Sequence, residues 1–392
     1  MVKKLYGSLV GVRPGKLADH MLALGFAPRE VVHRLCLERE VDPLRAKLLV
    51  EVALLQRELL APFAATQDLV SLYIGIPFCP SRCAYCSFAS HSLDKYRRAE
   101  LERYCEGLVH EISSLGTQLR QLGLKVATCY IGGGTPTTLA PRELSSLLAA
   151  VRALPLWESA FELTVEAGRA DTMEAEKLDI LPRDIRLAIN PQSMHDATLT
   201  AIGRSHTVEQ VREKYALART MGFDNINMDL IVGLPGEDAQ AVRYSMAEVL
   251  DLAPDSVTLH MFSRKRASRF GGGEVWQTMD DTEAYMASDL TTEMLRQRGL
   301  RPYYLYRQRA ILAGLENIGW ARPGKECLYN MLIIGESQTI IGVGAGATSI
   351  FPLKTTEWER HANPKDAKMY LDRLPQLVAE KGRLLSEWRS KL

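Results

Sequence analysis

Residues 71–88, SLYIGIPFCPSRCAYCSF, join a short apolar run to three closely spaced cysteines. Cys79, Cys83 and Cys86 are three of seven cysteines in 392 residues, and random placement gives such a triplet on the order of 0.002 times. The spacing therefore indicates a shared role for the three thiols. It raises the question of what holds three thiols so close together, and why a fourth is missing.

The apolar run is the first of six β-branched, apolar segments that are separated by helical patterns. These segments cover residues 71–76, 125–131, 160–166, 185–190, 225–232 and 255–261. Regular alternation of strands with helices predicts a parallel sheet. Because six units are too few for the common closed eight-stranded barrel, we expect an α/β fold with an open, partial (β/α)6 TIM-like barrel.

Reactive or polar groups follow each of the six predicted strands. They are the three cysteines, the turn Gly132-Gly133-Gly134-Thr135-Pro136, Glu166, Gln192, Asp229 and His260. The carboxyl ends of parallel strands meet at one edge of a sheet, and sites are built there. We therefore expect thiols, a glycine turn and polar side chains to converge on one rim of the barrel.

The regions that flank the barrel have different patterns. Residues 1–65 carry apolar residues at three- and four-residue steps, which predicts an N-terminal helical segment. We assign residues 66–270 to the partial barrel. Residues 271–392 have an α+β pattern with glycine-rich turns, and we assign them to a C-terminal domain.

Composition argues against several classes of protein. The formal net charge of +1 argues against nucleic-acid binding through overall charge. No run is long and apolar enough to span a membrane, and no cleavage pattern follows the basic first residues. An odd number of cysteines in a chain this large argues against a disulfide framework. We therefore expect a reduced, cytoplasmic protein whose clustered thiolates hold metal.

Two kinds of metal centre compete for the cysteine cluster. A closed zinc site needs four ligands, and His91 could complete a Cys3His set. A [4Fe–4S] cluster is also held by thiolates, and three of them leave one iron open to another ligand. The position of the cysteines at a strand end, directly before a helix, favours the catalytic iron–sulfur alternative.

The CxxxCxxC pattern after the first strand of such a domain resembles the radical S-adenosylmethionine (SAM) superfamily. The resemblance implies that the three cysteines hold a [4Fe–4S] cluster and that SAM chelates the open iron. A glycine turn lets backbone carbonyls approach the SAM amino group, and a planar guanidinium can bind its carboxylate. The residues that we expect to bind SAM are Tyr73, Tyr85, Phe88, Gly132, Gly133, Gly134, Thr135, Glu166, Gln192, Arg204 and Asp229.

A longer set of strings resembles one group within that superfamily. YIGIPFCPSRCAYCSF, YIGGGTPTTL, VEAGR, INPQSM, IGRSHT and MDLIVGLPGE together are similar to the oxygen-independent coproporphyrinogen III oxidases. GLENIGWARPGKECLYN and QTIIGVGAGATS resemble its HemZ-type branch, so the similarity covers most of the chain. Members of this branch often carry a further N-terminal segment, and we expect this chain to be a short or trimmed form.

The resemblance implies an oxidoreductase of anaerobic haem biosynthesis. An electron from a donor such as flavodoxin or ferredoxin would enter the cluster and cleave SAM to methionine and a 5′-deoxyadenosyl radical. That radical would take a hydrogen atom from a propionate of coproporphyrinogen III, and loss of carbon dioxide and one electron would leave a vinyl group. Two such turnovers give protoporphyrinogen IX.

A substrate with several carboxylates needs cations around the site. The basic stretch SRKRASRF, residues 263–270, follows the sixth predicted strand. We expect Arg264, Arg266 and Arg307 to bind the propionates, with the C-terminal domain covering the substrate. The alternative interpretation of the basic stretch is a solvated loop or a phosphate-binding patch.

Phe88 marks a departure from the group. The well-known coproporphyrinogen oxidases have a fourth cysteine two places after the third, and here that place holds Phe88. In this respect the sequence resembles the haem-chaperone branch, whose members bind haem. Three hypotheses stay open: a radical SAM decarboxylase of coproporphyrinogen III; a haem- or porphyrin-binding chaperone, or another tetrapyrrole-modifying radical SAM enzyme; and a zinc-stabilised α/β protein.

Overall fold

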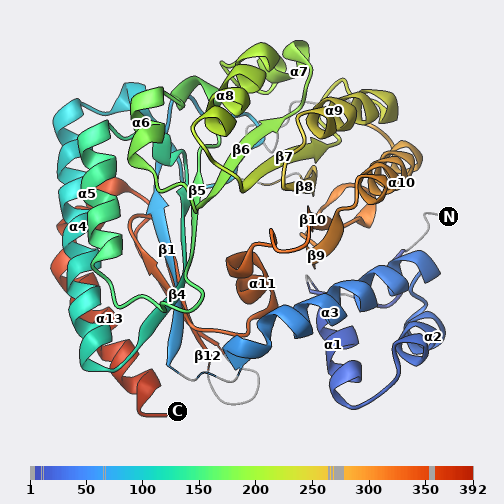
Figure 1. Ribbon diagram of the computed structural model, residues 1–392, viewed down its shortest axis with the longest axis horizontal. Helices are drawn as coiled ribbons and strands as arrows, with labels where there is room; N and C mark the ends of the chain where they lie inside the picture. Colours follow the sequence, from blue (N-terminus) through green and yellow to red (C-terminus); the bar gives the residue numbers. More distant parts are fainter. Residues whose placement is uncertain are drawn as a thin grey trace.

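The protein is built on one eleven-stranded sheet, seen in a computed structural model that describes residues 5–9, 11, 13–64, 66, 68–263, 265, 268, 278–352 and 358–391. The strands follow one another in the order β13, β12, β11, β1, β4, β5, β6, β7, β8, β10 and β9. Figure 1 shows the sheet curving around a concave face, with most helices outside it.

The middle of the sheet consists of the six predicted parallel strands. They are β1 (Leu69–Ile76), β4 (Lys125–Gly133), β5 (Glu162–Glu166), β6 (Arg186–Gln192), β7 (Ile226–Val232) and β8 (Ser256–Met261). Each pairs in parallel with the next. These strands are buried on both faces along most of their length, which explains why they are near-continuous apolar runs. All six predicted strands are confirmed.

Helices follow each of the first five parallel strands. They are α4 (Arg98–Gln121), α5 (Pro141–Arg152), α6 (Ala175–Ile180), α7 (Asp196–Ala201), α8 (Val208–Thr220) and α9 (Ala239–Asp251). α8 begins where the sequence signals a start, because the Thr207 hydroxyl accepts from the Gln210 backbone N–H and the Gln210 side chain accepts from the Thr207 N–H. The cap fixes the end of the short loop that carries Arg204.

Strands from the C-terminal part of the chain extend both ends of the parallel sheet. β11 (Ile340–Val343) lies parallel to β1, and β12 (Thr348–Pro352) and β13 (Trp358–Ala362) follow antiparallel. At the other end, β10 (Asn317–Ala321) pairs antiparallel with β8, and β9 (Arg301–Tyr306) pairs with β10. The order of strands ends at β13 and β9, so the sheet is open in the described part of the chain, as expected for a partial barrel.

The three-segment division proposed from the sequence stays a prediction. Strands from both sides of residue 270 share the one sheet, and residue 270 itself lies outside the described residues. The N-terminal region contains α1 (Gly15–Ala23), α2 (Pro28–Arg39) and α3 (Pro43–Ala64). α3 contacts β9 and α11, and Gln56 on α3 donates to the Tyr303 carbonyl at 2.8 Å.

The remaining elements complete the C-terminal part and the cysteine loop. They are β2 (Phe78–Cys79), β3 (His91–Ser92), α10 (Asp281–Gln297), α11 (Leu328–Gly335), α12 (Ala367–Asp372) and α13 (Leu374–Arg389), with short 3-10 turns at Leu93–Lys95, Pro136–Thr138, Ala170–Thr172 and Leu312–Gly314. α11 contacts β4 and β9 and lies on the concave side of the sheet (Figure 1).

A buried ion pair joins the C-terminal helix to the sheet beside the cysteine loop. Lys381 on α13 donates to the Glu111 carboxylate on α4, which also accepts the Gly344 backbone N–H at 2.8 Å, just after β11. Tyr104, also on α4, donates to the Gly75 carbonyl on β1 at 2.7 Å. α4 therefore holds β1 and the segment after β11 in register directly below the cysteines.

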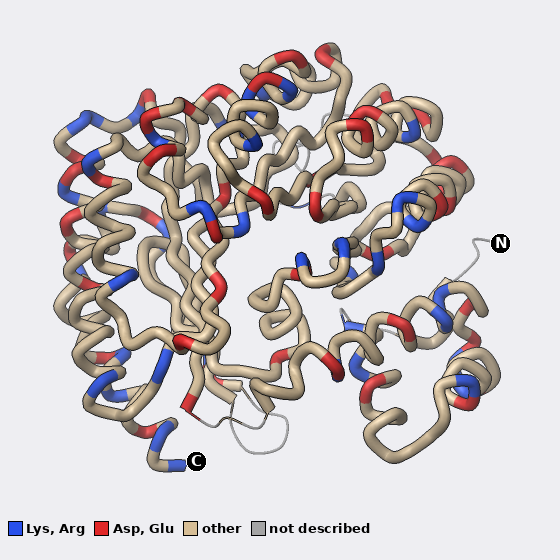
Figure 2. The backbone as a smooth tube through the Cα atoms, in the orientation of Figure 1, with Lys and Arg blue, Asp and Glu red and all other residues tan. Residues whose placement is uncertain are grey.

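Charges of both signs are interspersed along the outer helices (Figure 2), which agrees with the net charge of +1. Within the described residues, no helix combines the length and apolarity needed to cross a membrane.

Candidate functional site

The three predicted cluster ligands lie on the loop that follows β1. The loop begins at Cys79, where β2 pairs with β3 and closes its base. Its middle docks on the turn after α7, because Ala84 N–H donates to the Ile202 carbonyl at 2.9 Å and Ser81 Oγ donates to the Gly203 carbonyl at 3.1 Å. Hydrogen bonds within the chain therefore define the shape of the loop, and none of its three thiols is in a disulfide.

Two of the three thiols have hydroxyl groups as side-chain hydrogen-bond partners within the described residues. Thr135 Oγ1 donates to Cys79 Sγ at 3.6 Å, and Ser90 Oγ lies 3.9 Å from Cys86 Sγ. Burial raises the pKa of the Cys79 thiol to about 11 and also raises the pKa of Cys86. Both thiols therefore keep their protons at neutral pH until a metal displaces them.

The closed zinc site receives no support from the position of His91. His91 Nε2 lies 3.3 Å from the Lys365 carbonyl, and its ring packs against Tyr96. In the described part of the chain, no three His, Cys, Asp or Glu side chains gather closely enough to hold a single metal ion. A [4Fe–4S] cluster makes a different demand, because each thiolate binds a different iron and the sulfurs surround a larger body.

The glycine turn at the end of β4 lies against the base of the cysteine loop. Gly134 N–H donates to the Ile76 carbonyl and Thr135 N–H donates to the Phe78 carbonyl, both at 2.7 Å. A Cβ on Gly134 would lie 2.5 Å from the Phe78 oxygen and 2.8 Å from the Ile76 oxygen. Only glycine allows this approach, so the turn and the cysteine loop are positioned by one another.

Glu166 lies at the end of β5, beside the same turn. Its carboxylate accepts the Tyr130 hydroxyl at 2.6 Å and the Gly133 N–H at 3.3 Å, and a Cβ on Gly132 would lie 2.8 Å from Oε2. Burial raises the pKa of Glu166 to about 7, while the bond from Tyr130 opposes that rise. The carboxyl group is therefore poised between its two protonation states near neutral pH.

Gln192 is the last residue of β6, whereas Asp229 lies in the middle of β7 rather than at its end. Gln192 has a positive φ of 70°, and its Oε1 is buried without a partner among the described residues. A strained backbone and an unpaired buried acceptor are typical of a ligand-binding position. Asp229 accepts from Asn227 Nδ2 at 2.6 Å and lies 3.5 Å from His260 Nε2, so both carboxylate oxygens have polar neighbours.

Arg204 is buried, at 7% exposed, with acceptors from four elements around its guanidinium. Its partners are His206 Nε2 (3.5 Å), the Tyr85 hydroxyl (2.9 Å), Cys83 Sγ (3.9 Å), and the carbonyls of Asn190 (2.7 Å) and Gly168. A guanidinium has five N–H donors, and each has a partner here. To bind a carboxylate, Arg204 would have to release some of these partners.

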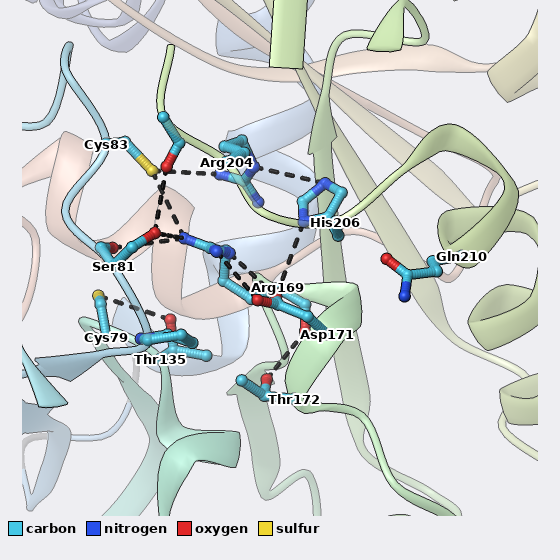
Figure 3. Close-up of polar contacts among 12 residues, drawn as sticks. Cys79, Ser81, Cys83, Thr135, Arg169, Asp171, Thr172, Arg204, His206 and Gln210 are labelled. Atoms are coloured by element: carbon cyan, nitrogen blue, oxygen red, sulfur yellow. Dashed lines mark hydrogen bonds and ion pairs between the residues drawn. The ribbon is translucent and has the colours of Figure 1, made fainter. Parts of the chain in front are cut away.

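The structure adds Arg169, which sequence reasoning missed. Arg169 follows β5, is 3% exposed, and donates from Nη1 to the Ser81 hydroxyl at 3.1 Å and to Cys83 Sγ at 3.9 Å. Asp171 binds its other edge in bidentate fashion at 3.1 and 3.0 Å. Figure 3 shows both arginines between Cys83 on one side and His206 and Asp171 on the other, with a contact from each arginine to the Cys83 sulfur. The sequence feature that could have identified Arg169 is its position in VEAGR, three residues after the end of β5.

The predicted aromatic residues divide into two groups. Tyr73 lies on the concave face, with ring centroids 6.2 Å from Tyr130 and 6.4 Å from Tyr329 on α11. Phe88, in contrast, is 67% exposed beside the cysteine loop. Tyr73 therefore contributes to an aromatic floor under the strand ends, whereas Phe88 has no such packing.

Residues 73–249 match the radical SAM superfamily. The chain is 40% identical, over 98% of its length and 78% of the relative, to the oxygen-independent coproporphyrinogen-III oxidase-like protein HemZ of Bacillus subtilis. The chain belongs to the radical SAM superfamily, in the HemZ-type branch of the oxygen-independent coproporphyrinogen III oxidase group. It is an enzyme of the oxidoreductase class.

Two further comparisons give another relative and a solved structure with the same fold. The haem chaperone HemW of B. subtilis is 30% identical over 80% of this chain and 76% of that relative. The solved structure of the radical SAM enzyme HemN, coproporphyrinogen III oxidase of Escherichia coli, covers 83% of this chain and 73% of its own with a TM-score of 0.62 and 22% identity. The likeness to HemN confirms the predicted radical SAM fold.

Radical SAM proteins use a [4Fe–4S] cluster and SAM, and the residues of this chain fit both. Three thiols project from one preformed loop, the glycine turn brings backbone to that loop, and Gln192 offers an unpaired oxygen on the same rim. Of the three arginines predicted to bind substrate, the structure describes Arg307. Arg264 and Arg266 lie outside the described residues, and Arg307 donates to the Leu9 carbonyl at 3.1 Å with its guanidinium 4.5 Å over the Tyr6 ring.

Proposed function

We propose that this protein oxidatively decarboxylates the propionates of coproporphyrinogen III to vinyl groups, giving protoporphyrinogen IX. The observation that carries the proposal is the 40% identity to HemZ over 98% of the chain, which reaches well beyond the radical SAM match at residues 73–249. The shared part thus includes the C-terminal strands that extend the sheet at both ends. We place the reaction in the cytoplasm, where reduced thiols persist, with a donor such as flavodoxin or ferredoxin.

We assign the cluster to Cys79, Cys83 and Cys86, with the open iron facing SAM. When bound, the reduced cluster and SAM supply hydrogen-atom abstraction from an unactivated carbon. The chain's own residues bind and orient SAM. The residues assigned to this task are Tyr73, Tyr85, Phe88, Gly132, Gly133, Gly134, Thr135, Glu166, Gln192, Arg204 and Asp229.

Each assigned polar group has a task that its surroundings support. The Gln192 oxygen lacks a donor, so a ribose hydroxyl would satisfy it. Glu166 and Asp229 are further acceptors for hydroxyls on the same rim. Arg204 would exchange backbone carbonyl partners for the SAM carboxylate, a charge-assisted bond that is stronger than those it replaces.

The substrate carboxylates need cations, and we assign Arg264, Arg266 and Arg307 to them. Arg307 lies on the segment directly after β9 and is held by contacts with Tyr6 and Leu9. Its role in substrate binding therefore depends on the N-terminal segment. Replacing Arg307 with Lys keeps the charge but loses the stacked, planar guanidinium.

A haem-binding chaperone is the second candidate. Phe88 stands where the well-known coproporphyrinogen oxidases have a further cysteine, and a haem chaperone is among the relatives at 30% identity. An exposed aromatic side chain beside the site would suit a flat macrocycle.

Anaerobic turnover separates the two candidates. Reconstituted protein would receive reductant, SAM and coproporphyrinogen III, and 5′-deoxyadenosine and vinyl products would be measured. The proposal predicts both products in the wild type and neither product in Cys86→Ser. Cys36→Ser is the matched control and should form both products, because its partly buried thiol on α2 is far from the loop in sequence. Tight haem binding without vinyl product would contradict it and favour the chaperone.

A further inference from the structure

Cys83 differs from the other two loop cysteines in the charge of its neighbours. Nη1 of Arg169 and Nη1 of Arg204 each lie 3.9 Å from its sulfur (Figure 3). For Cys79 and Cys86, the side-chain hydrogen-bond contacts within the described residues come from the hydroxyls of Thr135 and Ser90, although the charges of Arg82 and Lys265 also act on Cys86. Among the three thiols, Cys83 is thus the one whose sulfur two guanidinium groups of the described residues approach as hydrogen-bond donors.

Arg169 is held rigidly in this position. Asp171 binds its Nε and Nη2, and the Ser81 carbonyl and hydroxyl accept from Nη1 at 3.3 and 3.1 Å. His206 Nδ1 lies 3.8 Å from the Asp171 carboxylate. Because Asp171 binds the Nε and Nη2 side of the guanidinium, Nη1 is the nitrogen that faces the Cys83 sulfur.

The second arginine has a competing task. Arg204 is assigned to the SAM carboxylate, which would neutralise part of its charge once SAM binds. The Asp171 carboxylate already binds Arg169 through two charge-assisted hydrogen bonds, and no SAM group is assigned to Arg169. Arg169 is therefore the cation that stays at Cys83 in both the free and the SAM-bound states.

We propose that Arg169 is a positioning residue that holds the Cys83 ligand and raises the reduction potential of the cluster. The reason is electrostatic: hydrogen bonds and positive charge at a ligand sulfur stabilise the reduced, more negative cluster, and a buried guanidinium is always charged. The proposal rests on the assignment of the cluster to this loop. It does not depend on the tetrapyrrole substrate.

The test is a redox titration of the reconstituted cluster, followed by electron paramagnetic resonance (EPR) without SAM or substrate. Arg169→Gln removes the charge and keeps amide donors. We expect its ratio of reduced to oxidised cluster, at a fixed potential, to fall about tenfold, which is a shift of about 59 mV to more negative potential for one electron. Arg169→Lys keeps the charge and should recover at least half of that shift. Arg212→Gln, a partly exposed arginine on α8, is the matched control and should not shift.

Iron and sulfide content is measured on every variant. A wild-type midpoint in fully loaded Arg169→Gln would overturn the proposal, as would a lysine variant that behaves like the glutamine variant. If Arg169→Gln fails to hold the cluster, a loaded lysine variant at the wild-type potential supports the role of charge, and an unloaded one overturns it. Wild-type protein without a cluster would instead overturn the cofactor assignment itself.

Discussion

Replacing Gly134 with alanine tests whether the glycine turn and the cysteine loop position one another. The new Cβ would lie 2.5 Å from the Phe78 oxygen, and an ordinary contact begins near 3.4 Å. Both nearest atoms are backbone oxygens, so no side chain can rotate away. Relief requires the loop to move by about 0.9 Å relative to β4.

The cost of Gly134→Ala follows from that displacement. Overpacking costs about 1–3 kcal/mol, and losing one of the two 2.7 Å bonds to the Ile76 and Phe78 carbonyls adds about 1 kcal/mol. We therefore expect the free energy of unfolding to fall by about 2–4 kcal/mol. Since 1.4 kcal/mol corresponds to a tenfold change in an equilibrium constant, we expect cluster affinity to fall by at least about tenfold.

Two measurements check this prediction. Urea unfolding of metal-free protein reports the stability, and iron content after anaerobic reconstitution reports the cluster. The matched control is Gly15→Ala in α1, where a Cβ meets nothing within 4 Å; it should not lower stability, which can rise by up to about 1 kcal/mol, and it should leave the iron content unchanged. If Gly134→Ala unfolds and loads like this control, the close approach does not position the loop.

Two further predictions concern buried charges. Because burial raises the pKa of Glu166 from 4.5 to about 7, the folded protein binds that proton more tightly than the unfolded chain, and stability should fall by up to about 3 kcal/mol as pH rises from 5 to 8. Glu166→Gln should remove this slope from urea unfolding of metal-free protein, and an unchanged slope would refute it. Lys381→Met removes the cation from Glu111, which is 1% exposed and keeps only neutral donors such as the Gly344 N–H, and it should cost about 3–5 kcal/mol, most of it recovered in the Glu111→Gln/Lys381→Met double variant. A single-variant loss under about 1 kcal/mol would contradict that account.

Local patterns were enough to predict the six parallel strands and most of the rim. The apolar segments could be recognised because both faces of a parallel strand are buried. The rule that sites form at the carboxyl ends of parallel strands then selected the cysteines, Glu166, Gln192 and Asp229 as candidates. Gln192 adds a signal that only coordinates reveal, namely the positive φ and the unpaired oxygen.

Local patterns could not predict which distant segments of the chain pair with one another. Nothing near residue 340 indicates that β11 pairs with β1 more than 260 residues earlier, so the eleven-stranded sheet could not be predicted. The same holds for Arg169, whose contact with Cys83 joins two loops that are far apart in sequence. Arg307 was selected for its charge, yet its packing on Tyr6 depends on where the N-terminal segment folds back.

We propose that Cys79, Cys83 and Cys86 hold a [4Fe–4S] cluster whose open iron binds SAM. The EPR spectrum of anaerobically reconstituted, reduced protein, recorded with and without SAM and accompanied by iron, sulfide and zinc analysis, tests this claim. We predict the iron and sulfide of one [4Fe–4S] cluster per chain and a spectrum that changes when SAM is added. Stoichiometric zinc without iron, or a cluster spectrum that SAM leaves unchanged, would contradict the claim.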